Sequence, residues 1–243
     1  MDCLWALANF SNCNQALALK YIFDMGIVPI LININPGNNP ALIELPLRII
    51  GNMLTGDDFM IDMFISYGII GYLEKFLSSE YFQIRREAAW SLSNIASGTK
   101  SQILALINSG VLPKVFEIVK DSNADVVRES VWVFANCLTG SDLDLCVKLV
   151  KIGIMDPIIY TIGNHLEPSI LVIALEGLRT LFSQGNFVKE LSNNNDNPFV
   201  TNFINKGGAE YLEKLQAHKN VEVYKSVIQI LDTYFTVIEE KFR

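Results

Sequence analysis

The chain contains few of the residues from which enzyme centres and metal sites are built. Its 243 residues include only two histidines, and no two of its four cysteines have the spacing of a CxxC pair. No zinc-binding pattern can be assembled from that inventory. A glycine-rich phosphate loop and a nucleophile paired with a histidine are missing as well. The sequence therefore predicts no enzyme, no catalytic residues, no metal site and no cofactor.

The sequence also lacks a long apolar run and a surplus of positive charge. The longest apolar stretches, such as 152–162, are interrupted by Gly, Asp and Pro, so none is expected to span a bilayer. Nineteen Lys and Arg residues stand against 26 Asp and Glu residues, which gives a formal net charge of −7. Nucleic-acid binders carry a basic surface for phosphates. We therefore expect neither a membrane nor a nucleic acid as partner, whereas an acidic surface favours cationic partners.

Half of the residues are apolar, which is the composition of a folded chain. Because no pairing pattern is evident, we expect the cysteines to be buried, reduced thiols of an intracellular protein. They are Cys3, Cys13, Cys137 and Cys146.

Two markers repeat along the chain with the same period. The first is a glycine followed by apolar residues, with successive steps of 42, 42, 43 and 54 residues. The second is a pair four residues apart, Trp or Arg and then Asn, whose Asn steps are 43, 42 and 42 residues. The glycines are Gly26, Gly68, Gly110, Gly153 and Gly207, and the pairs are Trp5 with Asn9, Arg48 with Asn52, Trp90 with Asn94 and Trp132 with Asn136.

A period near 42 residues lies in the range of about 40–47 that is typical of armadillo and HEAT repeats. One unit predicts three helices, over 100–109, 112–120 and 126–138, and three helices favour armadillo over the two-helix HEAT form. We expect Gly56, Gly98 and Gly140 to stop the third helices in the left-handed conformation. The predicted fold is an all-α, right-handed superhelical armadillo solenoid. It forms one array over 1–243 of about five to six repeats and begins inside a third helix.

The end of the chain departs from the period. A polar, Asn-rich segment predicts a loop insertion at about 192–199. Closing helices are expected over 201–214 and 221–235.

The third helices carry a repeated polar and aromatic stripe. Glu, Trp and Asn at i, i+3 and i+7 share one helix face, opposite the apolar face that contains Leu92 and Ile95 in one helix. In a solenoid these stripes line a concave groove. Asn amides there can hold a peptide backbone, Trp rings can hold the stems of Lys or Arg, and acidic residues can attract the charges. The stripe residues are Glu87, Trp90, Asn94, Glu129, Trp132 and Asn136, with Asp58 as a further acid.

The stripe has a second interpretation, in which each Trp packs between repeats and each Asn caps or braces a turn. Large aromatic residues are usually buried, which favours that view for one Trp in isolation. The repeated pair beside a Glu favours the binding view, because exposed Trp is costly unless something binds it.

Three segments resemble importin alpha, also called karyopherin alpha, the adaptor that carries nuclear localisation signals. They are 47–58 (LRIIGNMLTGDD), 85–98 (RREAAWSLSNIASG) and 174–178 (ALEGL). The resemblance runs from about Trp5 to Phe235 and covers the C-terminal part of that family's armadillo array. It implies that Trp5 and Asn9 form the step before an Arg-containing repeat, which holds Arg48, Asn52, Thr55 and Asp58. It further implies a minor signal-binding site at Glu87, Trp90, Ser93, Asn94, Glu129, Trp132 and Asn136, with Glu176 and Thr180 at the next step.

The resemblance also implies partners and a location. The expected ligands are Lys/Arg-rich nuclear localisation signals of cargo proteins, in the cytoplasm and the nucleus. The charge of Arg48 is expected to repel lysine and to separate the family's major and minor sites. Importin beta is not expected to bind, since the family docks it through a basic N-terminal segment that this sequence does not contain. An export receptor or a nucleoporin is the partner implied for the C-terminal repeats. The alternative function is an armadillo scaffold for other proteins without a transport role.

Overall fold

The computed structural model describes residues 1–12, 16–34, 39–164, 167–191 and 196–235. These residues form α-helices, one short 3-10 helix, turns and bends, and contain no strand. The chain divides into two compact units, Met1–Val133 (unit 1) and Phe134–Arg243 (unit 2). The all-α prediction is therefore confirmed for the part of the chain that the structure describes.

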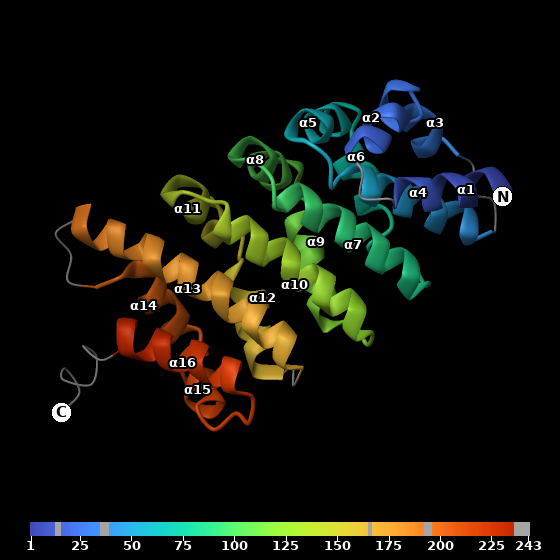
Figure 1. Ribbon diagram of the computed structural model, residues 1–243. Coiled ribbons are helices and arrows are strands. Elements are labelled where there is room, and N and C mark those ends of the chain that lie inside the picture. The colour runs from blue at the N-terminus through green and yellow to red at the C-terminus, as the bar shows by residue number, and fades with distance from the viewer. Residues whose placement is uncertain (13–15, 35–38, 165–166, 192–195, 236–243) are drawn as a thin grey trace, which may run out of the picture. The chain divides into compact units, whose positions relative to one another are not determined.

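Unit 1 contains helices in a repeating order of two short and one long (Figure 1). A long helix begins the unit, and three groups of three follow, the last of which ends in a helix that continues into unit 2. The helices are α1 (Asp2–Ser11), α2 (Ala16–Asp24), α3 (Val28–Ile32), α4 (Ala41–Met53), α5 (Asp58–Ser66), α6 (Ile69–Glu74), α7 (Phe82–Ala96), α8 (Lys100–Ser109), α9 (Leu112–Glu117), η1 (Ile118–Lys120) and α10 (Ala124–Thr139).

Unit 2 repeats the same order, with two more groups of three. They consist of α11 (Leu143–Lys151), α12 (Met155–Asn164) and α13 (Pro168–Leu191), then α14 (Pro198–Asn205), α15 (Gly208–Leu215) and α16 (Val221–Tyr234). Three helices per group confirm the armadillo rather than the HEAT arrangement.

The turn between the first and second helix of each group contains a left-handed glycine. The φ angles at these glycines lie between +67° and +94°, a region that other residues rarely adopt. This explains why glycine recurs there with the period of the fold. The five positions are Gly26, Gly68, Gly110, Gly153 and Gly207.

The prediction of left-handed stops at Gly56, Gly98 and Gly140 is wrong, since none of these three described glycines has a positive φ. The helices before the first two end in right-handed residues. Gly98 is needed for space instead, because a Cβ there would lie 3.0 Å from Cδ of Gln102 and closer still to its Oε1. The Gln102 side chain occupies that space because it completes a capping box with Thr99.

A polar side chain caps the first helix of several groups. The Asp57 carboxylate accepts from the Met60 N–H (2.8 Å) and Asp142 accepts from Leu145 N–H (3.1 Å). Each cap satisfies a backbone N–H that has no partner inside the helix. The same role belongs to Thr99 on α8 and to Asn197 on α14.

The long helices bury the predicted apolar face. Ala88, Leu92 and Ile95 of α7 are fully buried. In unit 1, α4 packs against both α1 and α7; in unit 2, α13 packs against α12, α14 and α16. The residues that face away from this core are thus the ones available to a groove. In α10, Val131, Ala135 and Leu138 are buried as well.

The end of the chain differs from the prediction at two points. A single helix over 201–214 is wrong, because Gly207 (φ +80°) separates α14 from α15. Residues 192–195 of the predicted loop lie outside the described residues, whereas Pro198 and Phe199 already belong to α14. The closing helix over 221–235 is confirmed as α16.

One ion pair of low exposure joins α7 to the turn before α10. Arg85 Nε donates to Asp121 Oδ2 (2.6 Å) and its Nη2 donates to Oδ1 (2.9 Å), while Nη1 donates to the Ser79 carbonyl. The side chains of Arg85 and Asp121 are 16% and 8% exposed. Burial raises the pKa of Asp121, but hydrogen bonds from Arg85 and from the N–H of Asn123 outweigh it and hold that pKa below its usual range.

The cysteines follow the prediction only in part. Cys137 and Cys146 are buried free thiols, and burial raises the pKa of each to about 12. Cys3 is exposed on α1, so the expectation of burial is wrong there. Cys13 lies outside the described residues.

Among the described residues, no single helix is long and apolar enough to cross a membrane, and one pair reaches that length only together. The pair is Lys100–Ser109 with Leu112–Lys120, which meet at an angle of 82°.

Candidate functional site

Unit 1 contains a cavity of about 490 Å³ along its long helices. Its walls come from α1, the long helix that begins the unit, and from the long helices of the three following groups, α4, α7 and the first part of α10. Seven of the predicted site residues line it, namely Trp5, Asn9, Arg48, Asn52, Glu87, Trp90 and Glu129. Of the predicted stripe, Glu87, Trp90 and Glu129 therefore gather on one surface of unit 1.

The two tryptophans that line the cavity differ in their packing. Trp5 is 49% exposed, whereas Trp90 is half-buried with its ring against Gly51 of α4. A Cβ at Gly51 would lie 2.6 Å from Cε3 of that ring, which is closer than real Cβ contacts allow. The absence of a side chain at Gly51 thus sets how deeply Trp90 sits between the two helices.

The asparagines brace neighbouring long helices. Asn52 Nδ2 donates to Ser11 Oγ (2.9 Å), and Asn94 Nδ2 donates to the Gly51 carbonyl (3.0 Å). The bracing interpretation is therefore correct for one amide donor of each side chain. Each amide still has a second N–H and an oxygen with which a ligand backbone can pair.

Glu87 is not the unpaired negative charge that the stripe predicts. It is only 3% exposed. Its Oε1 accepts from Arg48 Nε (3.2 Å) and Nη2 (3.0 Å) and from Arg86 Nη2 (2.6 Å). Two guanidinium groups therefore neutralise Glu87, and a ligand cation would have to displace one of them.

Arg48 is likewise compensated rather than a bare positive charge. Besides Glu87, it pairs with Glu44 one turn earlier on α4 (2.7 Å). The expected repulsion of lysine by Arg48 is consequently reduced, because two carboxylates screen that charge.

Glu129 is the cavity carboxylate with the least compensation. It is half-buried, and no hydrogen bond or ion pair reaches it within the described residues. Burial raises the pKa of the Glu129 carboxyl above its usual range, against the opposing charges of Arg128 and Arg86. A cation that reached Glu129 would find an acceptor that has lost water without gaining a partner.

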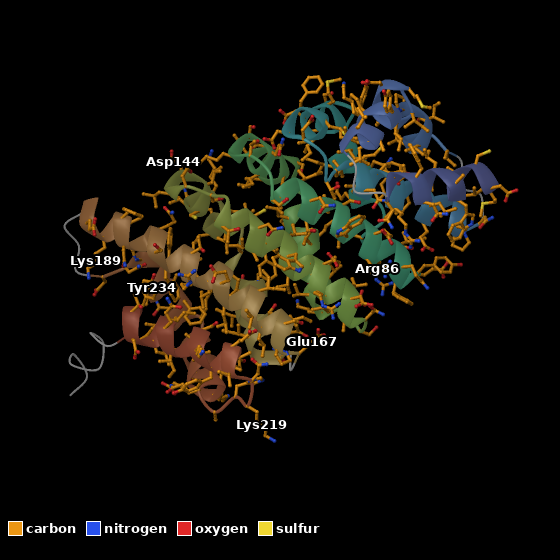
Figure 2. All side chains as sticks on the ribbon, viewed as in Figure 1. Arg86, Asp144, Glu167, Lys189, Lys219 and Tyr234 are labelled. Carbon is orange, nitrogen blue, oxygen red and sulfur yellow. The ribbon has the colours of Figure 1, made fainter. Side chains whose placement is uncertain are left out.

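Sequence reasoning missed the two arginines that precede the stripe. Arg86 and Arg128 stand one residue before Glu87 and Glu129, and both line the cavity. Their identical placement four residues before each Trp was a signal that could have revealed them. Figure 2 labels Arg86 on α7. Asn12 and Asp125 also line the cavity, and Asp125 pairs with Arg128 (2.7 Å). The cavity therefore carries balanced charges rather than a negative surface.

Six predicted site residues lie outside the lining of this cavity. Trp132 is 41% exposed, Asn94 is half-buried, and Ser93 is buried with its hydroxyl donating to the Trp90 carbonyl (2.8 Å). Thr55 and Asp58 are exposed, one beyond the end of α4 and one at the start of α5. Asn136 belongs to unit 2 and is half-buried.

The next predicted step lies on α13 of unit 2. Glu176 is exposed and pairs with Arg179 on the same helix, and Thr180 donates its hydroxyl to the Glu176 carbonyl (3.1 Å). These contacts are local to one turn, so they neither support nor oppose a binding role.

Comparison with known proteins agrees with this architecture. The family model described as "Armadillo/beta-catenin-like repeat" matches residues 60–97, and the one described as "Atypical Arm repeat" matches residues 197–242. A solved designed armadillo-repeat protein in complex with the peptide (KR)4 superposes with a TM-score of 0.83 at 24% identity, over 96% of this chain and 92% of that one. At that identity the likeness shows the fold, which is the armadillo fold.

Two plant proteins are similar to the chain over nearly its whole length. Importin subunit alpha-1a of Oryza sativa subsp. japonica is 29% identical over 96% of the chain, and importin subunit alpha-4 of Arabidopsis thaliana is 28% identical over 99%. The matches cover 44% and 45% of those two proteins, so the chain spans about half the length of the relatives it matches. The resemblance read from the sequence is thereby confirmed.

Proposed function

We propose that this chain, which is related to the importin alpha subunits over nearly its whole length, is a peptide-binding part of a nuclear import adaptor. Its ligand is an extended Lys/Arg-rich segment of the nuclear localisation signal type, and it acts in the cytoplasm and the nucleus. The observation that carries the proposal is the cavity of unit 1, which Trp5, Trp90 and Glu129 line from three helices.

The spacing of the groups suits an extended peptide. Packed helices lie about 8–10 Å apart, and an extended chain advances about 3.3 Å per residue, so one repeat spans about three peptide residues. The unused amide groups of Asn52 and Asn94 can pair with the peptide backbone, which makes that contact independent of peptide sequence. Side chains then decide which peptide is preferred.

Cation recognition falls to the Glu129 region. Glu87 already accepts from two arginines, whereas Glu129 has no such partner within the described residues. A Lys or Arg stem can lie along the rings of Trp90 and Trp132 while its charge approaches Glu129. Glu129 is therefore the favoured site for the ligand cation, because its desolvated carboxylate gains most from a new partner.

The alternative function is a scaffold that binds acidic segments, and one observation favours it. Arg48, Arg86 and Arg128 all line the cavity. Each of them is paired with a carboxylate of the chain itself, however, which lowers its attraction for a further anion. Titration with a Lys/Arg-rich peptide and with a Glu-rich peptide of equal length separates the two functions.

Removal of an exposed ring is the first test of the basic-peptide function. Trp132→Ala is expected to lower the affinity for a Lys/Arg-rich peptide roughly 5- to 30-fold, because the variant loses a partly desolvated cation–π interaction and the contact of the ring with the side-chain stem. Because Trp132 is 41% exposed, the circular dichroism spectrum should stay unchanged. Tyr67→Ala, which removes an exposed ring outside both the cavity lining and the predicted stripe, is the control and should bind as before. Calorimetry that shows equal affinity for both variants would contradict the proposal.

The arginine beside Glu87 gives a test of opposite sign. Arg86→Met keeps the apolar stem but removes one of the two charges that neutralise Glu87. Affinity for the basic peptide should therefore rise about two- to fivefold, the range for one exposed charge pair. Arg179→Met, which breaks an exposed pair in unit 2, is the matched control without an expected effect. A fall in affinity for the basic peptide would instead support the acidic-ligand alternative.

A further inference from the structure

Unit 2 contains a second cavity, which is unrelated to the predicted stripe. It has a volume of about 600 Å³ and lies between α12, α15 and the turn that leads into α16. Cavities of about 300–1,000 Å³ are the usual size of ligand sites. No residue of the repeated Glu, Trp and Asn stripe lines it.

The inner wall of this cavity is apolar. It includes Ile162 of α12, which is 3% exposed, and the half-buried Leu215 and Tyr211 of α15. Gly163 permits the arrangement, because a Cβ there would lie 2.8 Å from Cε1 and Cζ of the Tyr211 ring. The ring therefore lies directly on the α12 backbone and leaves space beside it.

The rim of the cavity is cationic. Lys214 and Lys219 are exposed, and neither forms an ion pair with any described residue. Lys214 Nζ lies 5.2 Å from the centroid of the Tyr211 ring, which holds its charge above the apolar wall. Figure 2 shows Lys219 extending outward from the turn after α15.

A third donor belongs to His218. The Asn220 N–H donates to His218 Nδ1 (3.1 Å), so the proton of the neutral ring resides on Nε2. Nε2 carries a proton whether the ring is neutral or charged, and His218 lines the cavity. Two ammonium groups and one imidazole donor therefore surround an apolar wall.

We propose that this cavity binds an acidic peptide segment that carries one bulky apolar side chain. The apolar side chain lies against Ile162, Tyr211 and Leu215, and flanking carboxylates pair with Lys214, Lys219 and the His218 N–H. The charges of Lys214 and Lys219, which form no ion pair with a described residue, complement an acidic ligand although the chain as a whole has a net charge of −7. A small inorganic anion is a poorer occupant, since exposed ion pairs alone contribute little and an ion leaves the apolar wall in water.

The test uses the full chain and a fluorescent peptide with a phenylalanine between glutamates, measured by polarisation. Two altered probes accompany it, one with serine in place of the phenylalanine and one with glutamines in place of the glutamates. The serine probe should bind roughly tenfold more weakly or worse, from lost burial of the ring. Equal binding of the serine probe would reduce the site to a nonspecific attraction for negative charge and overturn the proposal.

Variants locate the site. The double variant Lys214→Met, Lys219→Met should bind the acidic probe on the order of fivefold more weakly. Lys75→Met, which changes an exposed lysine of unit 1, should leave the affinity for the probe unchanged. Gly163→Ala should weaken it as well, since the Tyr211 ring must move into the cavity. Gly71→Ala, whose Cβ would meet nothing within 4 Å, is its control.

A final pair of measurements separates this site from the groove in unit 1. Trp132→Ala should leave the acidic probe unaffected, and a saturating Lys/Arg-rich peptide should not displace it. The proposal would be contradicted if the Trp132 variant no longer bound the acidic probe, or if the lysine and the Gly163 variants both bound it as tightly as the unaltered chain. Equally tight binding of a short RNA would contradict it too. Failure of the basic-peptide function leaves these outcomes unchanged, so the two proposals are tested separately.

Discussion

Asp121→Asn is expected to lower the free energy of unfolding by about 3 kcal/mol. The change leaves the Arg85 guanidinium with little exposure and without its counter-charge, and loss of one partner of a buried pair costs about 3–5 kcal/mol. We place the effect at the lower end because Arg85 keeps its hydrogen bonds to the Ser79 and Glu80 carbonyls. Urea unfolding of both proteins at neutral pH measures the difference.

The matched control is Asp24→Asn, which removes the same charge from an exposed pair with Lys20. Exposed pairs of this type contribute roughly 0–1 kcal/mol, so this variant should unfold nearly as the unaltered chain does. Similar losses for the two variants would mean that the charge change itself, rather than burial of Arg85, causes the effect.

The same pair predicts a dependence on pH. The pKa of Asp121 in the folded chain lies below its usual value, which is about 3.9 in an unfolded chain. A depressed carboxyl pKa contributes stability that is fully present above the unfolded pKa and is lost as pH falls through the folded pKa. The difference between the unaltered chain and Asp121→Asn should therefore be constant near neutrality and shrink below about pH 4. A difference that persists at low pH would exclude the ion pair as its origin.

Gly51→Ala is expected to weaken peptide binding at least as strongly as loss of an exposed ring does. The new Cβ would overlap the Trp90 ring, so the ring must leave its place between α4 and α7. Overpacking of this kind typically costs about 1–3 kcal/mol of stability. Affinity for the Lys/Arg-rich peptide should fall on the order of tenfold or more, as the displaced ring closes the cavity.

Gly71→Ala is the control for this change, since Gly71 is helical and a Cβ there meets nothing within 4 Å. Replacement of a helical glycine by alanine favours the helix by up to about 1 kcal/mol, so that variant should be slightly stabilised and bind normally. Calorimetry together with tryptophan fluorescence distinguishes the two. Unchanged affinity in Gly51→Ala would show that Trp90 plays no part in binding.

The sequence period predicts the helices well because it reports a backbone requirement. Gly110 ends one helix in a left-handed turn, and Pro113 begins the next where its missing N–H costs nothing. Those effects act over a few residues and can therefore be read locally. The helices over 100–109, 112–120 and 126–138 were predicted to within a residue or two for this reason.

The errors arise where an effect depends on a distant neighbour or on space. Gly98 reads as a helix stop, yet its conformation is ordinary and its lack of a side chain accommodates Gln102. The helix predicted over 201–214 is apolar on one face throughout, and the break at Gly207 follows from the repeat rather than from that pattern. Local patterns do not distinguish a glycine needed for its φ angle from one needed for its size.

In the candidate site, too, the local features can be predicted from the sequence and the contacts between distant residues cannot. That Glu87 and Trp90 share a helix face follows from the helical period and is independent of tertiary structure. That Arg48 neutralises Glu87 depends on a contact between α4 and α7, from residues 39 apart in the sequence. The sequence pattern indicates which residues share a helix face but not which partners they meet, so it overstates the negative charge of the groove.

The burial of two thiols has a consequence for chemical labelling. The thiolate is the reactive form of cysteine, and a pKa of about 12 leaves roughly one thiol in 10⁵ ionised at neutral pH for Cys137 and Cys146. Among the described cysteines, Cys3 alone is exposed to a maleimide or iodoacetamide reagent. It lies on α1 two residues before Trp5, which lines the cavity of unit 1. Residues two apart face different sides of a helix, and Cys3 is not among the residues that line the cavity, so a dye attached there would mark α1 from the side away from the groove and leave the groove free for a peptide.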